Sequence, residues 1–406
     1  MLKWGILAWI NSDHRDAESS AAVDHKPRVR WNAQAHRSRP RSPRMTADLR
    51  LDGLRVWLSQ VLGDASISIA PASADASFRR YFRISFDEAA VQSSSRSLLA
   101  PKLAQHLDAH ANTDGSTATL IAMDAPPPQE DCRPYVQVAS LLIDAGVHAP
   151  SVLAQNLEDG FLLLTDLGTQ TYLDALHPET AAQLIADAST ALLRWQSASR
   201  PGVLPPYDRA LLQRELELFP TWYVERHLGI DLTVEQRKTL DSAFAQIIAN
   251  NLDQPCVYVH RDFHSRNLMV SSPNPGVLDF QDAVYGPITY DLVSLLRDAY
   301  VDWDEAAQID YAVRYWEQAR RARLPVAADF ADFWRDFEWM GVQRQLKVLG
   351  IFARLQHRDG KDGYLKDMPR VMGYLRSACD RYRALGPLLG LLDELEQRTH
   401  TTGYTF

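Results

Sequence analysis

The chain has 406 residues, which is too long for one small hydrophobic core and suits two lobes or domains. Its 51 acidic residues outnumber its 43 lysines and arginines, and the formal net charge of -8 gives no electrostatic case for binding nucleic acid or an anionic membrane. No apolar stretch approaches the roughly 20 residues that cross a bilayer. Cys132, Cys256 and Cys379 are too few and too widely spaced for a disulfide framework, so we expect a cytoplasmic protein.

The first part of the chain predicts a polar extension followed by a sheet-rich lobe. Residues 11–44 almost lack apolar periodicity, and we expect an extension over 1–45 to be disordered. Beyond it the apolar pattern changes from helical spacing to the alternation typical of strands. The expected elements are a helix over 51–62, strands over 78–86 and 119–123 with a polar hairpin loop over 93–116 between them, a helix over 136–145, and a strand pair over 151–155 and 160–164.

Helical patterns dominate from residue 178 onward. Short strands are expected there at 257–259, 268–270 and 277–279. Strands early in the chain and helices later are typical of an α+β protein. We therefore predict a sheet-rich N-lobe over 46–167 and a larger helical C-lobe over 168–406.

A cluster of polar residues follows the strand expected at 257–259. Asp262 and Asn267 are five residues apart, and Asp279 ends another short apolar run twelve residues later. In phosphotransferases this spacing places a base beside the attacking hydroxyl and an amide oxygen on Mg²⁺. Carboxylate and amide oxygens are also the hard ligands that Mg²⁺ prefers. The motif predicts a site where the γ-phosphate of ATP, Mg²⁺ and an acceptor hydroxyl meet.

Simpler interpretations of the same residues exist. An aspartate before a short apolar stretch can cap a helix, although Asn267 and Asp279 in register weaken that explanation for Asp262. His260 and His264 are four residues apart and could bind zinc on a helix. Arg261, however, stands where H-E-x-x-H has its glutamate, and no third ligand is evident.

The motif resembles that of the aminoglycoside phosphotransferase and choline kinase superfamily, H-x-D-x-x-x-x-N followed by an acidic metal ligand. The resemblance extends from about residue 65 to about residue 376. It implies a bilobal, protein-kinase-like α+β fold that uses ATP and Mg²⁺. It also implies that Asp262 is the catalytic base and that Asn267 and Asp279 are the metal ligands. The residues that the resemblance assigns to support of the loop are His260, His264 and Asp291.

The nucleotide side departs from the superfamily pattern. Residues 75–83 lie where the superfamily has its phosphate-covering hairpin, but a glycine-rich loop is absent, and Met123 stands in place of the phosphate-binding lysine. Arg79 or Arg80 could supply the missing cation, or could lie on the solvent face of a strand. The segment 162–168 is expected to join the lobes and take the adenine edge, or to be an apolar edge strand without a ligand. The residues predicted to contact the nucleotide are Ser77, Phe78, Arg79, Arg80, Leu164 and Asp166.

Three stretches, 123–131, 214–223 and 343–352, resemble the bacterial anomeric kinases that phosphorylate N-acetylmuramate and N-acetylglucosamine at C1 in peptidoglycan recycling. This resemblance implies an amino-sugar acceptor. Arg344 and Lys347 are three residues apart, so one helical face could hold the carboxylate of N-acetylmuramate, or simply expose both side chains. The candidate sugar ligands are Glu215, Trp222, Tyr223, Arg344 and Lys347, with a place in the core as the alternative for the tryptophan.

Three other functions fit parts of the sequence. A kinase of another small alcohol, such as an aminoglycoside or choline, would share the catalytic residues. A nucleotide-binding module without activity would explain Met123 in place of the lysine. A metal-dependent hydrolase would use His260 and His264. No nucleic acid, membrane or obligate protein partner is expected for the amino-sugar kinase.

Overall fold

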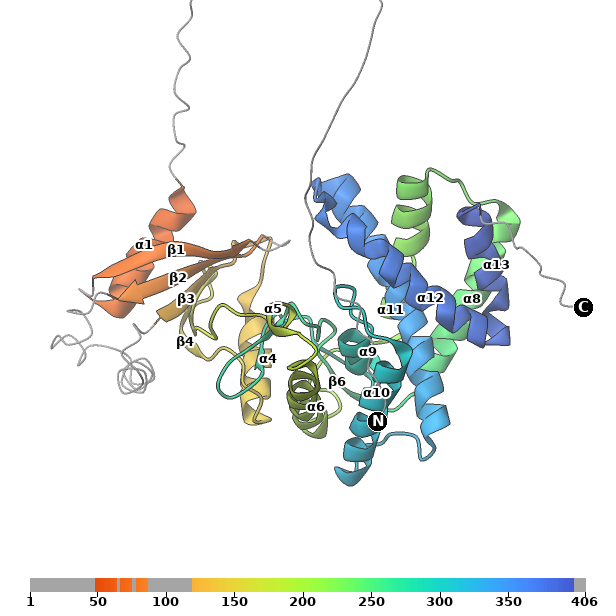
Figure 1. Cartoon of the computed structure of the whole chain (residues 1–406). Helices are drawn as coiled ribbons and strands as arrows, with labels where there is room; N and C mark the ends of the chain where they lie inside the picture. The colour runs from red at the N-terminus through yellow and green to blue at the C-terminus, as the bar shows by residue number, and fades with distance from the viewer. Residues whose placement is uncertain (1–47, 64–65, 75–77, 87–118, 398–406) are drawn as a thin grey trace, which may run out of the picture.

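The computed structural model describes residues 48–63, 66–74, 78–86 and 119–397. The predicted disordered extension, the polar loop at 93–116 and Ser77 lie outside these residues. The described chain forms a small lobe built on a sheet and a larger helical lobe, as predicted (Figure 1).

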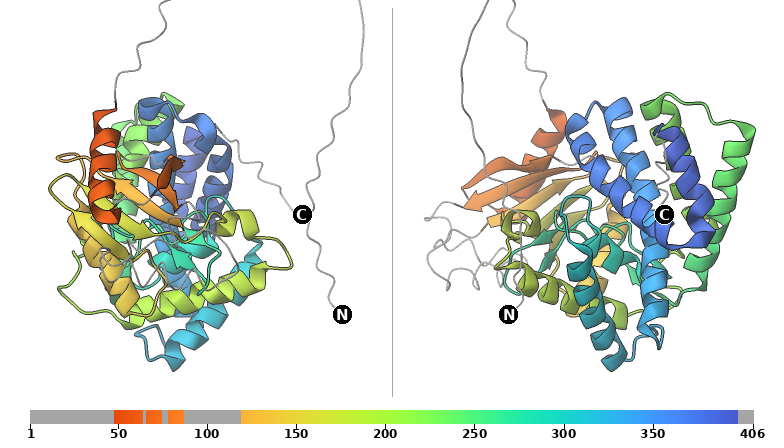
Figure 2. Two further views of the ribbon diagram at one scale, coloured as in Figure 1. Left: turned by 90° about the vertical axis from the view of Figure 1, so that its left-hand side faces the viewer. Right: turned by 45° about the vertical axis from the view of Figure 1, so that its right-hand side comes forward.

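The small lobe is a five-stranded antiparallel sheet with the strand order β1-β2-β3-β5-β4. Its strands are β1 (Ile67–Ala74), β2 (Arg80–Phe86), β3 (Thr119–Asp124), β4 (Val152–Asn156) and β5 (Phe161–Thr165). The helix α1 (Leu49–Leu62) lies against one face of this sheet (Figure 2). Leu54 and Leu58 of α1 pack there with Ile84 and Leu163, and burying each such side chain contributes about 1.5–3 kcal/mol.

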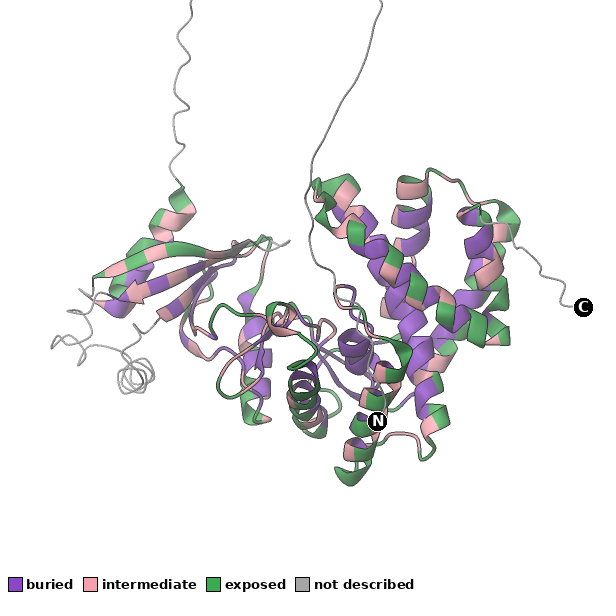
Figure 3. Ribbon diagram, in the orientation of Figure 1, coloured by how far each residue is buried: buried purple, intermediate pink, exposed green. Residues whose placement is uncertain are grey.

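The large lobe surrounds one long helix, α11 (Phe330–Asp359). Buried residues run along much of its length (Figure 3) because α8, α9, α12 and η2 pack against it. The helix α4 (Cys132–Asp144) lies between β3 and β4 in the chain. The other helices of the large lobe are α5 (Tyr172–Ala175), α6 (Ala181–Ser197), α7 (Arg209–Leu216), η2 (Phe219–Leu228), α8 (Val234–Asp253), α9 (Tyr290–Leu296), α10 (Glu305–Arg321), η3 (Asp362–Asp367), α12 (Met368–Arg381), η4 (Arg383–Leu385) and α13 (Gly386–Leu395). No described helix is both long and apolar enough to cross a membrane.

Two short strand pairs interrupt the helical lobe. β6 (Cys256–Val259) pairs with β9 (Val284–Pro287), and β7 (Leu268–Met269) pairs with β8 (Gly276–Val277). The chain between β6 and β9 therefore leaves and returns at one place, and it carries the predicted motif. Gly286 of β9 is needed for this arrangement, because a Cβ there would lie 2.5 Å from Cβ of Tyr207.

The strands expected from alternation and from short apolar runs are confirmed, with ends that differ by one or two residues. The strand expected from Phe78 begins at Arg80, and the helix expected from Val136 begins at Cys132, where Asp131 caps it by accepting from the Arg133 amide. β1 and β9 were not predicted. β1 contains Pro71, which an edge strand tolerates because one side of its backbone needs no partner.

Candidate active site

The loop after β6 brings Asp262, Asn267 and Asp279 together. The backbone turns tightly, since the His264 amide donates to the Asp262 carbonyl at 3.0 Å and the Asn267 amide donates to the His264 carbonyl at 2.9 Å. The Asn267 side-chain nitrogen lies 3.0 Å from the Asp262 carbonyl oxygen and 3.4 Å from Oδ2 of Asp279. The Asn267 side chain therefore joins the Asp262 backbone to the Asp279 carboxylate, which brings the three residues into one small region.

Asp291, in the first turn of α9, holds the backbone of this loop in place. Its buried carboxylate accepts hydrogen bonds from the amides of His260, at 2.7 Å, and Arg261, at 2.9 Å. Arg261 has a φ of 77°, a left-handed conformation that costs a non-glycine residue about 1–2 kcal/mol. The two hydrogen bonds offset that strain and set the direction in which the chain enters the turn at Asp262.

Neutral His260 forms a second support. Burial lowers its pKa to about 4. Its Nε2 lies 3.0 Å from the Leu278 carbonyl, and its Nδ1 lies 3.3 Å from the Asp262 amide. Both ring nitrogens therefore have partners within the loop. Among the described residues no group of three His, Cys, Asp or Glu side chains converges, so the zinc alternative finds no third ligand there.

Positive charge surrounds the Asp262 carboxylate. Burial raises its pKa, but the nearby cations Lys347, Arg261 and Arg344 lower it, and the net shift is downward. Asp262 is therefore ionised at neutral pH, as a group that accepts a hydrogen bond from an attacking hydroxyl must be.

Glu215 and Lys347, both predicted as sugar ligands, belong to a buried ionic network behind Asp262. Glu215 pairs with Arg261 and with Lys347, whose Nζ lies 3.0 Å from Oε1, and it accepts a hydrogen bond from the Tyr207 hydroxyl. Lys347 also donates to the Tyr290 hydroxyl at 3.0 Å. These contacts link α7 and α11 to the loop and satisfy both side chains within the protein. A contact of either with a sugar stays a prediction.

The remaining predicted sugar ligands have different surroundings. Tyr223 is buried and stacks on Phe219 with ring centroids 5.1 Å apart, and Trp222 packs partly buried against the same core. Arg344 is only 4% exposed, so the alternative of an exposed helical pair with Lys347 is wrong. The Nη1 atom of Arg344 has no hydrogen-bond partner among the described residues. Among the predicted sugar ligands, Arg344 therefore combines a buried nitrogen that lacks a partner among the described residues with a position near Asp262.

The donors around Asp279 fit Mg²⁺. Gln281 donates to Oδ1 of Asp279 at 2.9 Å, and its own Oε1 is buried without a partner among the described residues. Asn267 uses its nitrogen for its hydrogen bonds, which leaves its amide oxygen as a donor to a cation. Mg²⁺ in phosphoryl-transfer sites uses one or two carboxylates and takes its other ligands from phosphates and water. Gln281 was not predicted as a site residue, because only its orphaned oxygen sets it apart.

Arg79 and Arg80 face different regions of the small lobe. Arg79 donates to Glu130 at 2.9 Å and approaches Oδ1 of Asp279 to 3.9 Å, so it spans the two lobes at the candidate metal site. Arg80 instead donates to the buried carboxylate of Asp124 at 3.0 Å and pairs with Asp48. Only Arg79 of the two approaches the candidate metal ligands. Phe78, which precedes Arg79 in the chain, is 68% exposed.

The connection between the lobes holds Leu164 and Asp166. Leu164 is buried in β5, between β3 and β4, opposite Ile121 and Val152. The Asp166 carboxylate accepts hydrogen bonds from Arg83 at 2.6 Å, from Thr119 at 2.8 Å and from the Gly168 amide at 3.0 Å. Asp166 therefore ties β2 and β3 to the connection, and its contact with a nucleotide stays a prediction.

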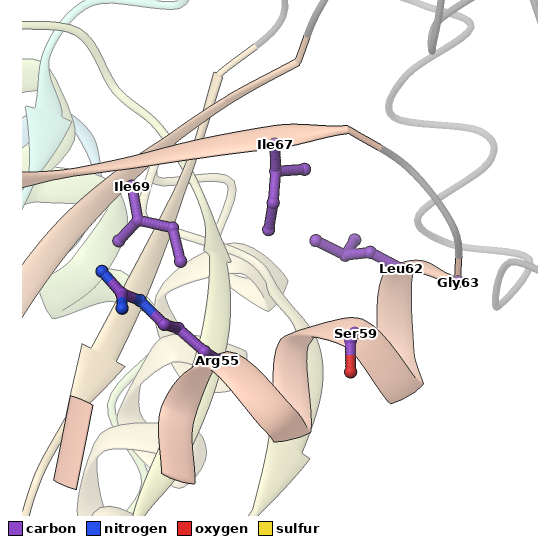
Figure 4. Close-up of a pocket in the computed structure, with 6 residues that line it drawn as sticks. All are labelled: Arg55, Ser59, Leu62, Gly63, Ile67 and Ile69. Atoms are coloured by element: carbon purple, nitrogen blue, oxygen red, sulfur yellow. The ribbon is translucent and has the colours of Figure 1, made fainter. Parts of the chain in front are cut away.

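A surface hollow of about 320 Å³ lies away from this site, between α1 and β1 (Figure 4). Its walls include Arg55, Leu62, Ile67 and Ile69. None of the predicted site residues lines it. We therefore assign the candidate active site from the polar contacts around Asp262 and Asp279 and not from this hollow.

A sheet lobe, a helical lobe and a polar loop held between short strand pairs define a protein-kinase-like fold. The chain matches the phosphotransferase enzyme family over residues 68–330 and belongs to that family. A solved choline/ethanolamine kinase family protein from Mesorhizobium loti has the same fold, with a TM-score of 0.53, 12% identity, and coverage of 85% of this chain and 99% of that chain.

Two relatives of this chain, from different bacteria, have the same name. The N-acetylmuramate/N-acetylglucosamine kinase of Pseudomonas aeruginosa is 47% identical over 363 residues, which is 87% of this chain and 99% of the relative. The N-acetylmuramate/N-acetylglucosamine kinase of Neisseria meningitidis is 46% identical over 358 residues, 87% of this chain and 98% of the relative.

Proposed function

We propose that this chain is an ATP-dependent kinase that phosphorylates the anomeric C1 hydroxyl of N-acetylmuramate and N-acetylglucosamine. The products would be ADP and the sugar 1-phosphates, and the pathway would be peptidoglycan recycling in the cytoplasm. The convergence of Asp262, Asn267 and Asp279 in one loop region carries the proposal of phosphoryl transfer. The relatives named N-acetylmuramate/N-acetylglucosamine kinase, 46–47% identical over most of the chain, support the choice of acceptor.

The catalytic role is assigned to Asp262. Its carboxylate would accept a hydrogen bond from the C1 hydroxyl and turn the oxygen lone pair toward the γ-phosphorus. As the new O–P bond forms, the bond between that phosphorus and the bridging oxygen breaks, ADP leaves with the electron pair, and the hydroxyl proton passes late to Asp262. The C1 hydroxyl of a hemiacetal is more acidic than an ordinary alcohol, which reduces the demand on the base.

The other polar residues position the reactants. Asn267 and Asp279 would hold Mg²⁺, with Gln281 as a further oxygen donor. Bound Mg²⁺ would neutralise the charge of the phosphate oxygens. Met123 stands where the superfamily has its phosphate-binding lysine, and Arg79 would supply the cation instead. The position of Arg79, which donates to Glu130 and lies close to Asp279, supports this role. The small lobe, 46–167, would then cover the nucleotide, and the lobe 168–406 would hold the sugar.

An ADP-release assay tests this proposal. The purified protein is given ATP and Mg²⁺ with N-acetylmuramate, N-acetylglucosamine, an aminoglycoside or choline in turn. Turnover with the two sugars and not with the amines is expected. The Asp262→Asn variant should lose about 10²–10⁴-fold in kcat and keep its affinity for ATP.

Asp282→Asn provides the matched control, because Asp282 is an exposed aspartate close to the motif in sequence. It should retain turnover. Faster turnover with the aminoglycoside or choline than with the sugars would contradict the proposed acceptor. Substantial turnover by Asp262→Asn would contradict the role of Asp262 as the base.

A further inference from the structure

A second arginine lies in the candidate catalytic loop and has no role in the account above. Arg266 follows Asp262 by four residues and is exposed. Its guanidinium carbon lies 4.7 Å from the ring centroid of Tyr300 and 5.6 Å from that of Tyr364. These cation–π contacts and hydrogen bonds to the side chains of the same two tyrosines hold the guanidinium in place. A guanidinium has five N–H donors, so others remain for a further acceptor.

The tyrosines are fixed to the catalytic loop. Asp298 accepts hydrogen bonds from the Ser265 amide at 2.9 Å and from the Tyr300 amide at 3.0 Å, so one carboxylate ties the start of the Tyr300 segment to the residue before Arg266. The His264 ring meets the Tyr300 ring edge-on at 5.7 Å. The cluster is thus continuous with the loop that holds Asp262.

A third contact holds the far tyrosine. Phe352 of α11 lies 6.2 Å from Tyr300 and 5.2 Å from Tyr364, measured between ring centroids. The two tyrosines that contact Arg266 therefore share one buried support, Phe352.

Arg266 has no carboxylate partner among the described residues, as no ion pair there includes it. Other arginines of the helical lobe are neutralised, such as Arg237 by Glu217 and Arg376 by Asp393. Tyrosine rings orient a guanidinium but do not cancel its charge. A fixed, uncompensated guanidinium is suited to bidentate binding of a carboxylate.

We propose that Arg266, Tyr300 and Tyr364 form a subsite for the carboxylate of an acidic amino sugar such as N-acetylmuramate. The inference rests on the proposed function and names the residues that distinguish the acidic acceptor from the neutral one. The outer end of the catalytic loop would hold the carboxylate while Asp262 faces the C1 hydroxyl.

This proposal differs from the sequence-based hypothesis, in which Arg344 and Lys347 were the candidates to hold the carboxylate. Arg344 is buried, and its charge lowers the pKa of Asp262 and opposes the rise that burial gives to the pKa of Asp291. A substrate carboxylate at Arg344 would therefore lie near two protein carboxylates and be repelled by them. No ion pair among the described residues includes Arg266, and the nearby Asp298 carboxylate is engaged by the Ser265 and Tyr300 amides.

The test compares Arg266→Met with Arg344→Met in steady-state assays with both sugars. Methionine keeps an unbranched apolar side chain between the tyrosine rings and removes the charge. For Arg266→Met we expect kcat/KM with N-acetylmuramate to fall about 10- to 100-fold, mainly through KM, which corresponds to loss of a charge-assisted hydrogen bond. The value with N-acetylglucosamine and the KM for ATP should change little. Arg344→Met should impair both sugars alike.

The possible results distinguish failure of the carboxylate subsite from failure of the proposed kinase function. Equal effects of Arg266→Met on both sugars, or no effect, would overturn the subsite while leaving the proposed function intact. A loss confined to N-acetylmuramate in Arg344→Met and absent in Arg266→Met would return the carboxylate to the inner arginine. A wild-type protein that phosphorylates neither sugar would overturn the proposed function and the subsite with it. Unchanged thermal unfolding of Arg266→Met serves as the folding control.

Discussion

Replacing Glu215 with glutamine removes one negative charge from the centre of the helical lobe and keeps the shape of the side chain. Glu215 is 4% exposed and pairs with two cations, Arg261 and Lys347. One oxygen of Glu215 accepts from Tyr207 and the other faces Arg261 and Lys347, so glutamine, whose NH2 group replaces one oxygen, loses an acceptor as well as the charge. Two buried positive charges would lose the group that compensates them.

The size of the effect follows from burial. Removing one partner of a buried ion pair costs about 3–5 kcal/mol, because the other charge stays desolvated and unpaired. Glu217, two residues further along, pairs with Arg237 where their side chains are 34% and 39% exposed. An ion pair that is open to solvent contributes about 0–1 kcal/mol. Glu215→Gln should therefore destabilise the protein by several times as much as Glu217→Gln.

Equilibrium urea unfolding of the two variants and the wild type measures this difference. The variants have the same chemical change and lie in the same stretch of chain, so differences in the unfolded state largely cancel. Equal losses of unfolding free energy, or a larger loss for Glu217→Gln, would contradict the reasoning that the Glu215 network is buried and mutually dependent.

Three further predictions concern the metal, the pH and the packing of α11. Asp279→Asn should raise the Mg²⁺ concentration for half-maximal turnover by about 10-fold or more, measured by titration. Burial lowers the pKa of His260 from 6.5 to about 4. As the pH falls from 6.5 to about 4, the unfolded chain takes up the proton before the folded protein does, so the free energy of unfolding should decrease by up to about 3 kcal/mol. The decrease should be smaller in His260→Asn. Gly350→Ala should cost about 1–3 kcal/mol, since its Cβ would lie 2.4 Å from the Leu218 backbone, whereas Gly373→Ala in open space should not destabilise.

The sequence was most informative where function requires a fixed spacing. Asp262, Asn267 and Asp279 could be recognised because a loop between short strands returns to the same place after a set number of residues, and the structure brings these three residues together. The strands of the small lobe could be predicted from apolar alternation, since one face of the sheet packs against α1.

Long-range partners could not be read from the sequence. Nothing local indicates that Glu215 on α7 meets Lys347 on α11, because that contact depends on how the helices pack. Their residue types suggested sugar ligands, which stays a prediction, and the structure shows in addition that they pair with each other. Arg266 was overlooked for a related reason: its significance comes from Tyr300 and Tyr364, which lie far from it in the sequence.

β1 and η2 were also difficult to predict. β1 includes Pro71 and several small residues, which weaken the strand signal, and its place at the sheet edge makes that composition acceptable. The π-helical turns of η2 carry Trp222 and Tyr223, whose aromatic character suggested a sugar platform. Core packing accounts for Tyr223, which stacks on Phe219.

Phosphorus NMR of a reaction with ATP, Mg²⁺ and N-acetylmuramate or N-acetylglucosamine tests the central claim most directly. The account predicts a new phosphomonoester signal coupled to the anomeric proton of the sugar, formed together with ADP and absent with Asp262→Asn. A phosphate coupled to another sugar position, or ADP appearing with free inorganic phosphate as its only companion, would contradict it.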